Sequence, residues 1–200
     1  MKVALLIDGG YLRACASAAK KMFDNKFIEK FAHSAVSSDE YLLRIFYYDA
    51  PQFRGKVPLP VSNEERTFQA SDKWLDDLAR LERFAVRKGT LGFRGWKPRT
   101  VPIEGGKPLT DADFSPIFEQ KGVDMRIGLD IAAFAQSKAV DRIVLVSGDQ
   151  DMIPAMKVAR KSGLEVAVVQ LPPPTKNLHD GLHAHSDFVR SLEDWPTASE

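Results

Sequence analysis

Aspartates follow directly on two short apolar runs of the sequence. Asp8 ends the run 3–7, and Asp149 and Asp151 come just after the run 143–146. Runs that are apolar at every position are typical of strands buried on both faces of a parallel sheet. In an open α/β sheet, ligands bind outside the carboxyl ends of the strands. We therefore expect these three carboxylates to meet at one edge of a sheet.

Carboxylates gathered in this way favour a particular chemistry. Like charges repel, and burying them unpaired is costly, so such a cluster persists best when a cation neutralises it. Ligands that are all oxygen favour the hard cations Mg²⁺ or Mn²⁺ over zinc. The competing interpretation is that each aspartate is an ordinary turn or capping residue, as Asp151 would be at the start of the next helix. The three aspartates taken together favour the metal site.

A fourth carboxylate comes from the helix expected over residues 123–137. Asp124 lies in its first turn, and Asp130 follows six residues later. At about 100° per residue the two side chains point roughly 120° apart, so both cannot easily reach one ion. We expect Asp124 to join the cluster. Asp130 is either a group that supports the ligands or a surface charge.

The elements that must position these residues alternate along the chain. The expected strands are 3–7, 41–48, 84–93, 143–146 and 165–169, and the expected helices are 11–22, 63–81, 123–137 and 153–162. Residues 51–60 and 94–116 are expected to be loops, the second one rich in proline and without clear periodicity. This order predicts an α/β fold, a three-layer Rossmann-like arrangement in which a mainly parallel sheet carries helices on both faces.

Composition sets wider bounds. The chain has 200 residues with 44% hydrophobic content, enough for one sizeable core, so we expect one domain over 1–195 and a disordered tail over 196–200. With a net charge of +1, any affinity for nucleic acid must come from local charge. The single cysteine, Cys15, excludes an internal disulfide framework and suggests a reducing compartment. Since no apolar stretch is long enough to span a bilayer, we expect a cytoplasmic protein.

Three motifs occur in order along the chain. They are Leu6-Ile7-Asp8-Gly9-Gly10-Tyr11, Lys121-Gly122-Val123-Asp124 and Val146-Ser147-Gly148-Asp149-Gln150-Asp151-Met152. Together they resemble the NYN domain family, a group of PIN-like domains that includes bacterial members of about this length. The resemblance covers most of the chain, and the three motifs in combination are specific where any one alone is weak.

The resemblance implies a PIN-like sheet and a metal-dependent ribonuclease, in which water activated on Mg²⁺ or Mn²⁺ hydrolyses a phosphodiester bond. The implied metal ligands and catalytic residues are Asp8, Asp124, Asp149 and Asp151. The first and third of these would be the most direct ligands, and Ser147 would assist through its hydroxyl group.

Two positions depart from the family pattern. Many relatives carry Asn shortly after the first aspartate, where this chain has Gly10 and Tyr11. This chain therefore lacks the side chain for one polar contact to substrate or water, and the expected metal site is unaffected. Relatives often have Phe where this chain has Met152, which is a variation in packing.

An RNA substrate needs a positive surface. Residues 83–107 contain seven lysines and arginines against Glu104 alone, with Phe93 and Trp96 among them. Basic side chains contact phosphates and aromatic rings stack on unpaired bases, so this mixture suits single-stranded RNA. The expected RNA-binding residues are Arg94, Trp96, Lys97, Arg99 and Lys121. The alternative is a solvated basic loop with Trp96 folded onto the core.

Two other classes of function stay open. A phosphatase of the haloacid dehalogenase type also has an aspartate after its first strand, but it needs a second one two positions later, where this chain has Gly10. A non-catalytic RNA-binding or protein-interaction module could retain the fold, although an abandoned site has no reason to keep repelling carboxylates together. The sequence does not decide the RNA target, endonucleolytic against exonucleolytic cleavage, or whether the chain forms a homodimer.

Three histidines near the C-terminus invite a zinc interpretation. His179 and His183 are four residues apart, a spacing that places two imidazoles on one helix face, and His185 follows. No cysteine or strong carboxylate pattern completes such a site. The segment is more simply interpreted as polar surface.

Overall fold

Six parallel strands form the central sheet of the computed structural model, which describes residues 1–103 and 106–197. They are β1 (Lys2–Asp8), β2 (Tyr41–Asp49), β5 (Phe84–Lys88), β8 (Arg142–Val146), β9 (Glu165–Gln170) and β10 (Phe188–Ser191). Their order across the sheet is β10-β9-β8-β1-β2-β5, and every neighbouring pair is parallel. Strands β1 and β8, which carry the aspartates, are therefore neighbours whose carboxyl ends meet at one edge.

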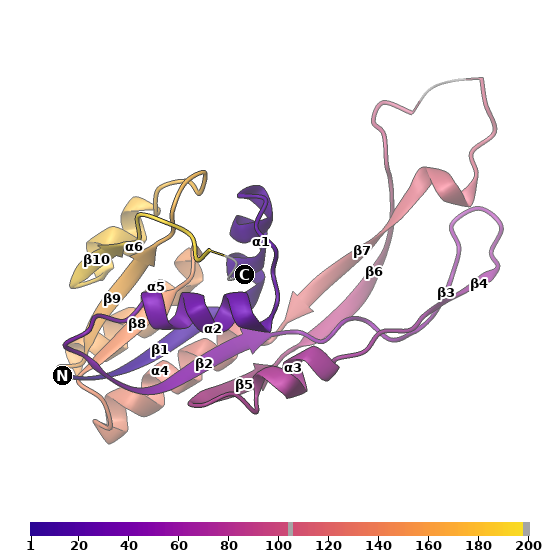
Figure 1. Ribbon diagram of the computed structural model, residues 1–200. Coiled ribbons are helices and arrows are strands. Elements are labelled where there is room, and N and C mark those ends of the chain that lie inside the picture. The colour runs from indigo at the N-terminus through magenta and orange to yellow at the C-terminus, as the bar shows by residue number, and fades with distance from the viewer. Residues whose placement is uncertain (104–105, 198–200) are drawn as a thin grey trace.

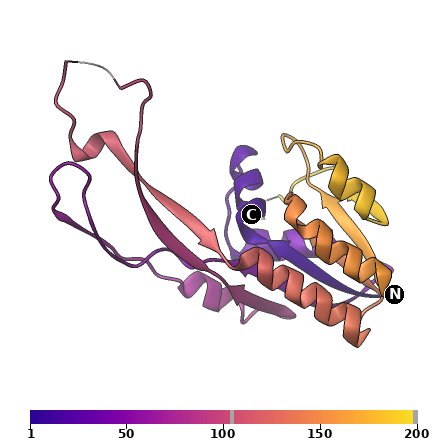
Figure 2. The ribbon, with the colours of Figure 1, turned by 180° about the vertical axis from the view of Figure 1, so that it is seen from behind.

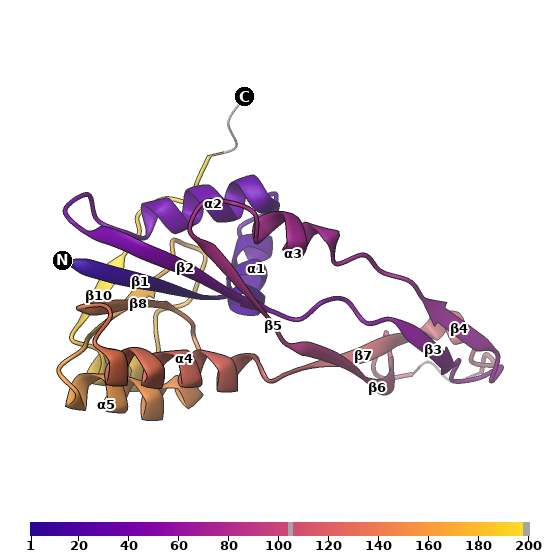
Figure 3. The same cartoon turned by 90° about the horizontal axis from the view of Figure 1, so that it is seen from below.

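Helices cover both faces of this sheet (Figures 1 and 3). On one face lie α1 (Gly9–Ala18), α2 (Asn25–Ser34) and α3 (Lys73–Leu78), and on the other α4 (Val123–Ser137), α5 (Ile153–Lys161) and α6 (Asp180–His185). Figure 2 shows α4 and α5 lying across the back of the sheet. The expected three-layer α/β fold is confirmed.

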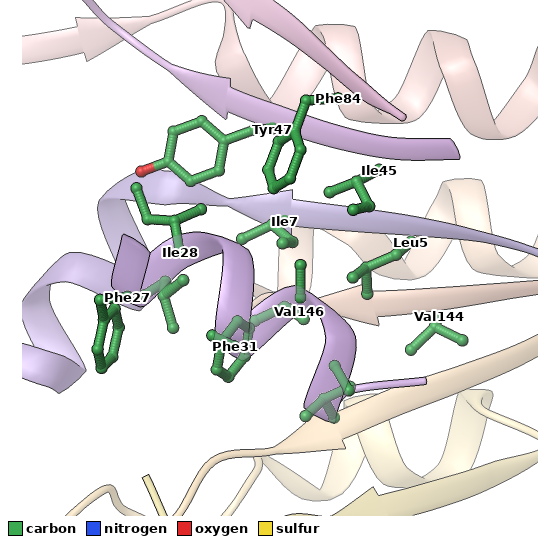
Figure 4. Packing of buried hydrophobic residues seen from close by; sticks show 14 of the residues in the cluster. Leu5, Ile7, Phe27, Ile28, Phe31, Ile45, Tyr47, Phe84, Val144 and Val146 are labelled. Atoms are coloured by element: carbon green, nitrogen blue, oxygen red, sulfur yellow. The ribbon is translucent and has the colours of Figure 1, made fainter. Parts of the chain in front are cut away.

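The sheet has one hydrophobic core on each face, because successive side chains of a strand point to opposite faces. Leu5 and Ile7 of β1 point into the first core, where Figure 4 shows them beside Phe31 of α2. Leu6, between them, points into the second core with the helices of the opposite face. Because both faces are covered, β1 has no polar face, which explains its uninterrupted apolar run.

A long arm extends from the carboxyl-end side of the sheet (Figure 1). It consists of two antiparallel pairs, β3 (Gly55–Pro58) with β4 (Glu65–Phe68), and β6 (Thr90–Pro98) with β7 (Phe114–Lys121). Its own small core is a set of half-buried aromatic rings with centroids 5.5–6.5 Å apart: Phe53, Phe68, Phe93, Trp96 and Phe118.

Most wrong predictions fall on the arm. The helix expected over 63–81 is wrong: β4 occupies its first part and α3 only its second part. The loop expected over 51–60 contains β3, and the loop expected over 94–116 contains much of β6, a 3₁₀ turn and the start of β7. The strand expected over 84–93 divides near Gly89 into β5 and β6. These strands pair with each other away from the main sheet, so they have neither the apolar run nor the alternation by which a buried strand is recognised.

The remaining differences lie in the main sheet and its helices. Helix α1 ends at Ala18, short of the expected boundary at residue 22, and α2, α6 and β10 have no counterpart among the expected elements. Of the tail expected over 196–200, residues 198–200 lie outside the described part of the chain, as do residues 104 and 105 in the basic segment. Within residues 1–103 and 106–197, no helix is both long and apolar enough to cross a membrane.

Candidate active site

Asp8 lies at the junction of β1 and α1 and is 9% exposed. Its Oδ1 accepts the backbone N–H of Tyr11 at 3.0 Å and so caps the helix. The turn needs glycine at position 9, since an added Cβ would lie 2.5 Å from Oη of Tyr47. Burial is the largest influence that raises the pKa of Asp8 to about 6; the Tyr11 N–H opposes it, and the charges of Asp124 and Asp149 add to it.

Asp124 reaches the same region from the opposite face of the sheet. Strand β7 ends at Lys121, and Gly122, in the left-handed region with φ 74°, turns the chain into α4. Asp124 lies in the first turn of this helix. Its pKa is raised, first by burial and then by the charges of Asp149 and Asp151.

The loop after β8 carries the other two aspartates. Ser147 is fully buried, and its Oγ accepts the backbone N–H of Asp149 at 3.1 Å. The Asp149 carboxylate in turn accepts the N–H of Asp151 at 2.9 Å, which starts a 3₁₀ turn over Gln150–Met152. The residue that caps here is thus Asp149, whereas α5 starts after Met152 without a side-chain cap. Asp151 does not act as the helix cap that the competing interpretation assigned to it.

Helix α1, which follows Asp8, and the loop that bears Asp149 are held against each other by the ring of Tyr11. The ring of Tyr11 lies over Gly148, so closely that an added Cβ would lie 2.5 Å from its Cε2. Only glycine leaves room for this contact between α1 and the loop that bears Asp149.

The four aspartates share one electrostatic field and have no cationic partner. Among the residues that the structure describes, none of them forms an ion pair with a lysine or arginine. The donor set and the unrelieved negative charge fit a hard divalent cation. As the side chains stand, however, no three His, Cys, Asp or Glu in the described ranges are placed to hold a metal ion. Binding would require these carboxylates to draw together around the ion.

Asp130 has other partners. Tyr48 Oη donates to its Oδ2 at 2.7 Å, and Arg87 Nε lies 3.1 Å from the same oxygen. This ion pair joins α4 to β5, so Asp130 is neutralised in place.

A further aspartate at this edge was missed by the sequence analysis. Asp49 ends β2, next to Asp8 on β1, and is fully buried. It pairs with Arg13 of α1, and it accepts hydrogen bonds from Tyr47 Oη at 3.2 Å and from the Ala50 N–H at 2.8 Å. Its position directly after a strand is the same signal that identified Asp8. The arginine distinguishes it, because a neutralised carboxylate has no need of a cation.

Gln120 is a second residue that the sequence did not single out. It lies at the base of the arm, where a Cβ added to Gly10 would be 3.3 Å from Gln120 Oε1 and 3.4 Å from Asp8 Oδ1. A side-chain amide therefore lies beside the first aspartate although the family's Asn is missing there.

The expected RNA-binding residues lie along the arm. Arg94 pairs with Glu119, and Lys121 Nζ is 3.9 Å from the same carboxylate. Arg99 Nε donates to a backbone carbonyl at 3.1 Å. Lys97 is exposed.

Trp96 packs among the rings of the arm, and its Nε1 donates to the carbonyl of Pro58 at 2.8 Å. Its ring therefore belongs to the arm's own core and not to that of the sheet.

The C-terminal histidines have a structural role at one position. His179 caps α6 by accepting the Gly181 N–H on its Nδ1 at 3.0 Å. His183 and His185 lie in the last turn of that helix.

Comparisons with known proteins agree with this fold. The profile of the NYN domain matches residues 2–192, nearly the whole chain. A solved structure of a protein of unknown function from Vibrio parahaemolyticus superimposes with a TM-score of 0.54 at 18% identity, covering 96% of this chain and 93% of that one, which shows a common fold. An uncharacterized protein of Sinorhizobium fredii is 34% identical over 55 residues, which are 28% of this chain and 26% of that protein.

Proposed function

Since this chain belongs to the NYN domain family, a branch of the PIN-like nucleases, we propose that it is a ribonuclease that depends on Mg²⁺ or Mn²⁺. One observation carries the proposal: the charges of Asp124 and Asp149 add to the burial that raises the pKa of Asp8, those of Asp149 and Asp151 do the same for Asp124, and none of the four pairs with a lysine or arginine within the described residues. A structural cluster of carboxylates would be expected to include an arginine or lysine, as the pair Arg13–Asp49 does beside it.

In this proposal the four aspartates hold the cation. When bound, the ion lowers the pKa of a coordinated water and offsets charge on the leaving oxygen of the phosphodiester. The chain's own part is to fix the ligands. Asp8 is fixed by its helix cap, and Asp149 by the buried hydroxyl of Ser147 that accepts its N–H.

The arm would hold the substrate. Strand β6 has nine residues, so at about 3.4 Å per residue it reaches roughly 30 Å, enough for several nucleotides of a single strand. Lys121 ends β7 three residues before Asp124, which places the base of the arm at the acidic cluster. The proposed contacts are Arg94, Trp96, Lys97, Arg99 and Lys121.

The test is cleavage of end-labelled single-stranded RNA with Mn²⁺ or Mg²⁺ by the full chain. The variant is Asp149→Asn, and its matched control is Asp39→Asn, the same change at an exposed turn near the opposite end of β2. We expect cleavage by the unmodified chain and by the control, and none by Asp149→Asn or in EDTA. Thermal unfolding of each variant checks that the fold is intact.

Two results would reject the proposal. Cleavage that survives in EDTA and in Asp149→Asn would mean that the aspartates hold no catalytic cation. RNA binding without cleavage by the unmodified chain, unaffected by either metal, would favour the non-catalytic module.

A further inference from the structure

A cavity of about 960 Å³ opens between the ends of α1, α2 and α3, on the first face of the sheet. Five lysines line it: Lys20, Lys21, Lys26, Lys30 and Lys73. Four of them lie within residues 20–30, in the loop after α1 and in α2, and the fold adds Lys73 from the start of α3. We call it the lysine cavity.

The charge of the lysine cavity is positive. Among the described residues that line it, two are aspartates, and both are engaged elsewhere: Asp24 accepts the Phe27 N–H at 2.8 Å as the cap of α2, and Asp77 pairs with Arg80 at 3.1 Å. Lys30 Nζ donates to the carbonyl of Thr197 at 3.0 Å. Within the part of the chain that the structure describes, the other four lysines form no ion pair with a carboxylate.

Aromatic rings form part of the wall. Phe23 and Trp74 line the cavity, and Phe27 lies 5.5 Å from Phe23 between ring centroids. The guanidinium of Arg13 lies 5.7 Å from the centroids of both Phe23 and Trp74. Lysines that contact phosphates beside rings that can stack on bases are the combination by which proteins hold single-stranded nucleic acid.

The cavity adjoins the acidic cluster. The ring of Trp74 meets that of Tyr47 edge-on, 6.3 Å between centroids. On its other side, the hydroxyl of Tyr47 lies against Gly9, next to Asp8. One tyrosine ring therefore separates the wall of the cavity from the first aspartate.

We propose that the lysine cavity binds the phosphates and bases of the RNA strand a few nucleotides from the bond at the acidic cluster. This inference rests on the proposed function for its substrate class. It adds the cavity as a second electrostatic contact beside the arm, where part of the positive charge is already paired, Arg94 with Glu119 and Lys56 with Glu65.

The test compares two double charge reversals in the full chain, with binding measured by fluorescence anisotropy in EDTA. Lys26→Glu/Lys73→Glu changes the cavity, and Lys157→Glu/Lys161→Glu makes the same change in net charge at exposed positions of α5 on the opposite face. Labelled single-stranded RNAs of increasing length are titrated at several salt concentrations.

We expect the cavity variant to lose tenfold or more in affinity for the longer RNAs, and its salt dependence to fall by a slope of about 1–2. The α5 variant should lose less than about threefold. Equal losses in the two variants, or none in the cavity variant, would overturn the inference. Because binding is measured in EDTA, it does not depend on metal-dependent cleavage. If the chain binds RNA through the cavity but never cleaves it in the assay with Mn²⁺ or Mg²⁺, that result contradicts the proposed function and leaves this inference standing.

Discussion

The charge of Asp124, in the first turn of α4, adds to the burial that raises the pKa of Asp8 at the end of β1. The two residues reach the same edge from different layers of the fold, Asp8 from the sheet and Asp124 from a helix that covers its second face. Their repulsion is a cost that the metal-free protein carries and that a divalent cation would relieve.

Asp8→Asn should stabilise the metal-free protein at neutral pH. The pKa of Asp8 is raised from 3.8 to about 6 in the folded state, so its contribution to stability is present below pH 4 and is lost as the pH rises through 6. Asn removes the charge and can still accept the Tyr11 N–H as a helix cap. In EDTA at pH 8 the free energy of unfolding should increase by up to about 3 kcal/mol.

Urea unfolding of both proteins from pH 4 to pH 8 measures this difference. The gain should be near zero at pH 4 and reach its plateau above pH 7. If the variant is less stable than the unmodified chain at both pH 4 and pH 8, the charge of Asp8 does not destabilise the folded protein.

Mn²⁺ or Mg²⁺ should raise the melting temperature of the unmodified chain at pH 8, and EDTA should reverse the rise. At a concentration 100 times the dissociation constant, a ligand specific for the folded state adds about 2.7 kcal/mol. Asp149→Asn should lose most of this response, whereas Asp39→Asn should keep it. Differential scanning calorimetry measures the melting temperatures. Equal metal-induced shifts in the two variants would mean that the ion binds elsewhere.

Gly148→Ala should impair the site, and Gly128→Ala should not. A methyl group at position 148 would lie 2.5 Å from the ring of Tyr11, so either the ring or the loop with Asp149 must move, at a cost of about 1–3 kcal/mol. At position 128, in α4, the nearest atom would be 3.9 Å away, and alanine should stabilise the helix by up to about 1 kcal/mol. Unfolding free energy and RNA cleavage are measured for both. Unchanged cleavage by Gly148→Ala would mean that the ring contact does not position Asp149.

Glu40→Gln should destabilise the fold by about 3–5 kcal/mol without touching the acidic edge. Glu40, whose side chain is 1% exposed, lies just before the start of β2 and binds Arg142 of β8 and Arg190 of β10. Burial alone would raise the pKa of its carboxyl group, but the bonds from Arg190, from the Ser37 N–H and from Arg142 lower it to about 2. Its contribution is therefore present above pH 4.5 and is lost as the pH falls towards 2.

Urea unfolding at pH 7 and pH 3 tests this prediction. The difference between Glu40→Gln and the unmodified chain should shrink at the lower pH. RNA affinity should stay the same at pH 7, since Glu40 lies at the far edge of the sheet. A variant with full stability at pH 7 would contradict the assigned role.

The sequence alone predicted the sheet and the origin of the acidic residues. Strands buried on both faces must be apolar throughout, so β1 and β8 were visible as runs, and each run ends at or just before the residues that carry the carboxylates. The helix of Asp124 was equally visible from its spacing. These features depend on local pattern and on a general rule of parallel sheets, and both can be inferred without coordinates.

Tertiary structure alone decided which charges are neutralised. Asp49 and Asp8 look alike in sequence, since each ends a strand. Within the described part of the chain, however, Asp49 pairs with Arg13 of α1 and Asp8 pairs with no basic residue. The arm was not recognisable either, because its strands are stabilised by rings that meet only after folding. The lysine cavity likewise needs the start of α3, which lies far along the sequence from the lysines of residues 20–30. Such pairings depend on distances between side chains that the order of residues does not contain.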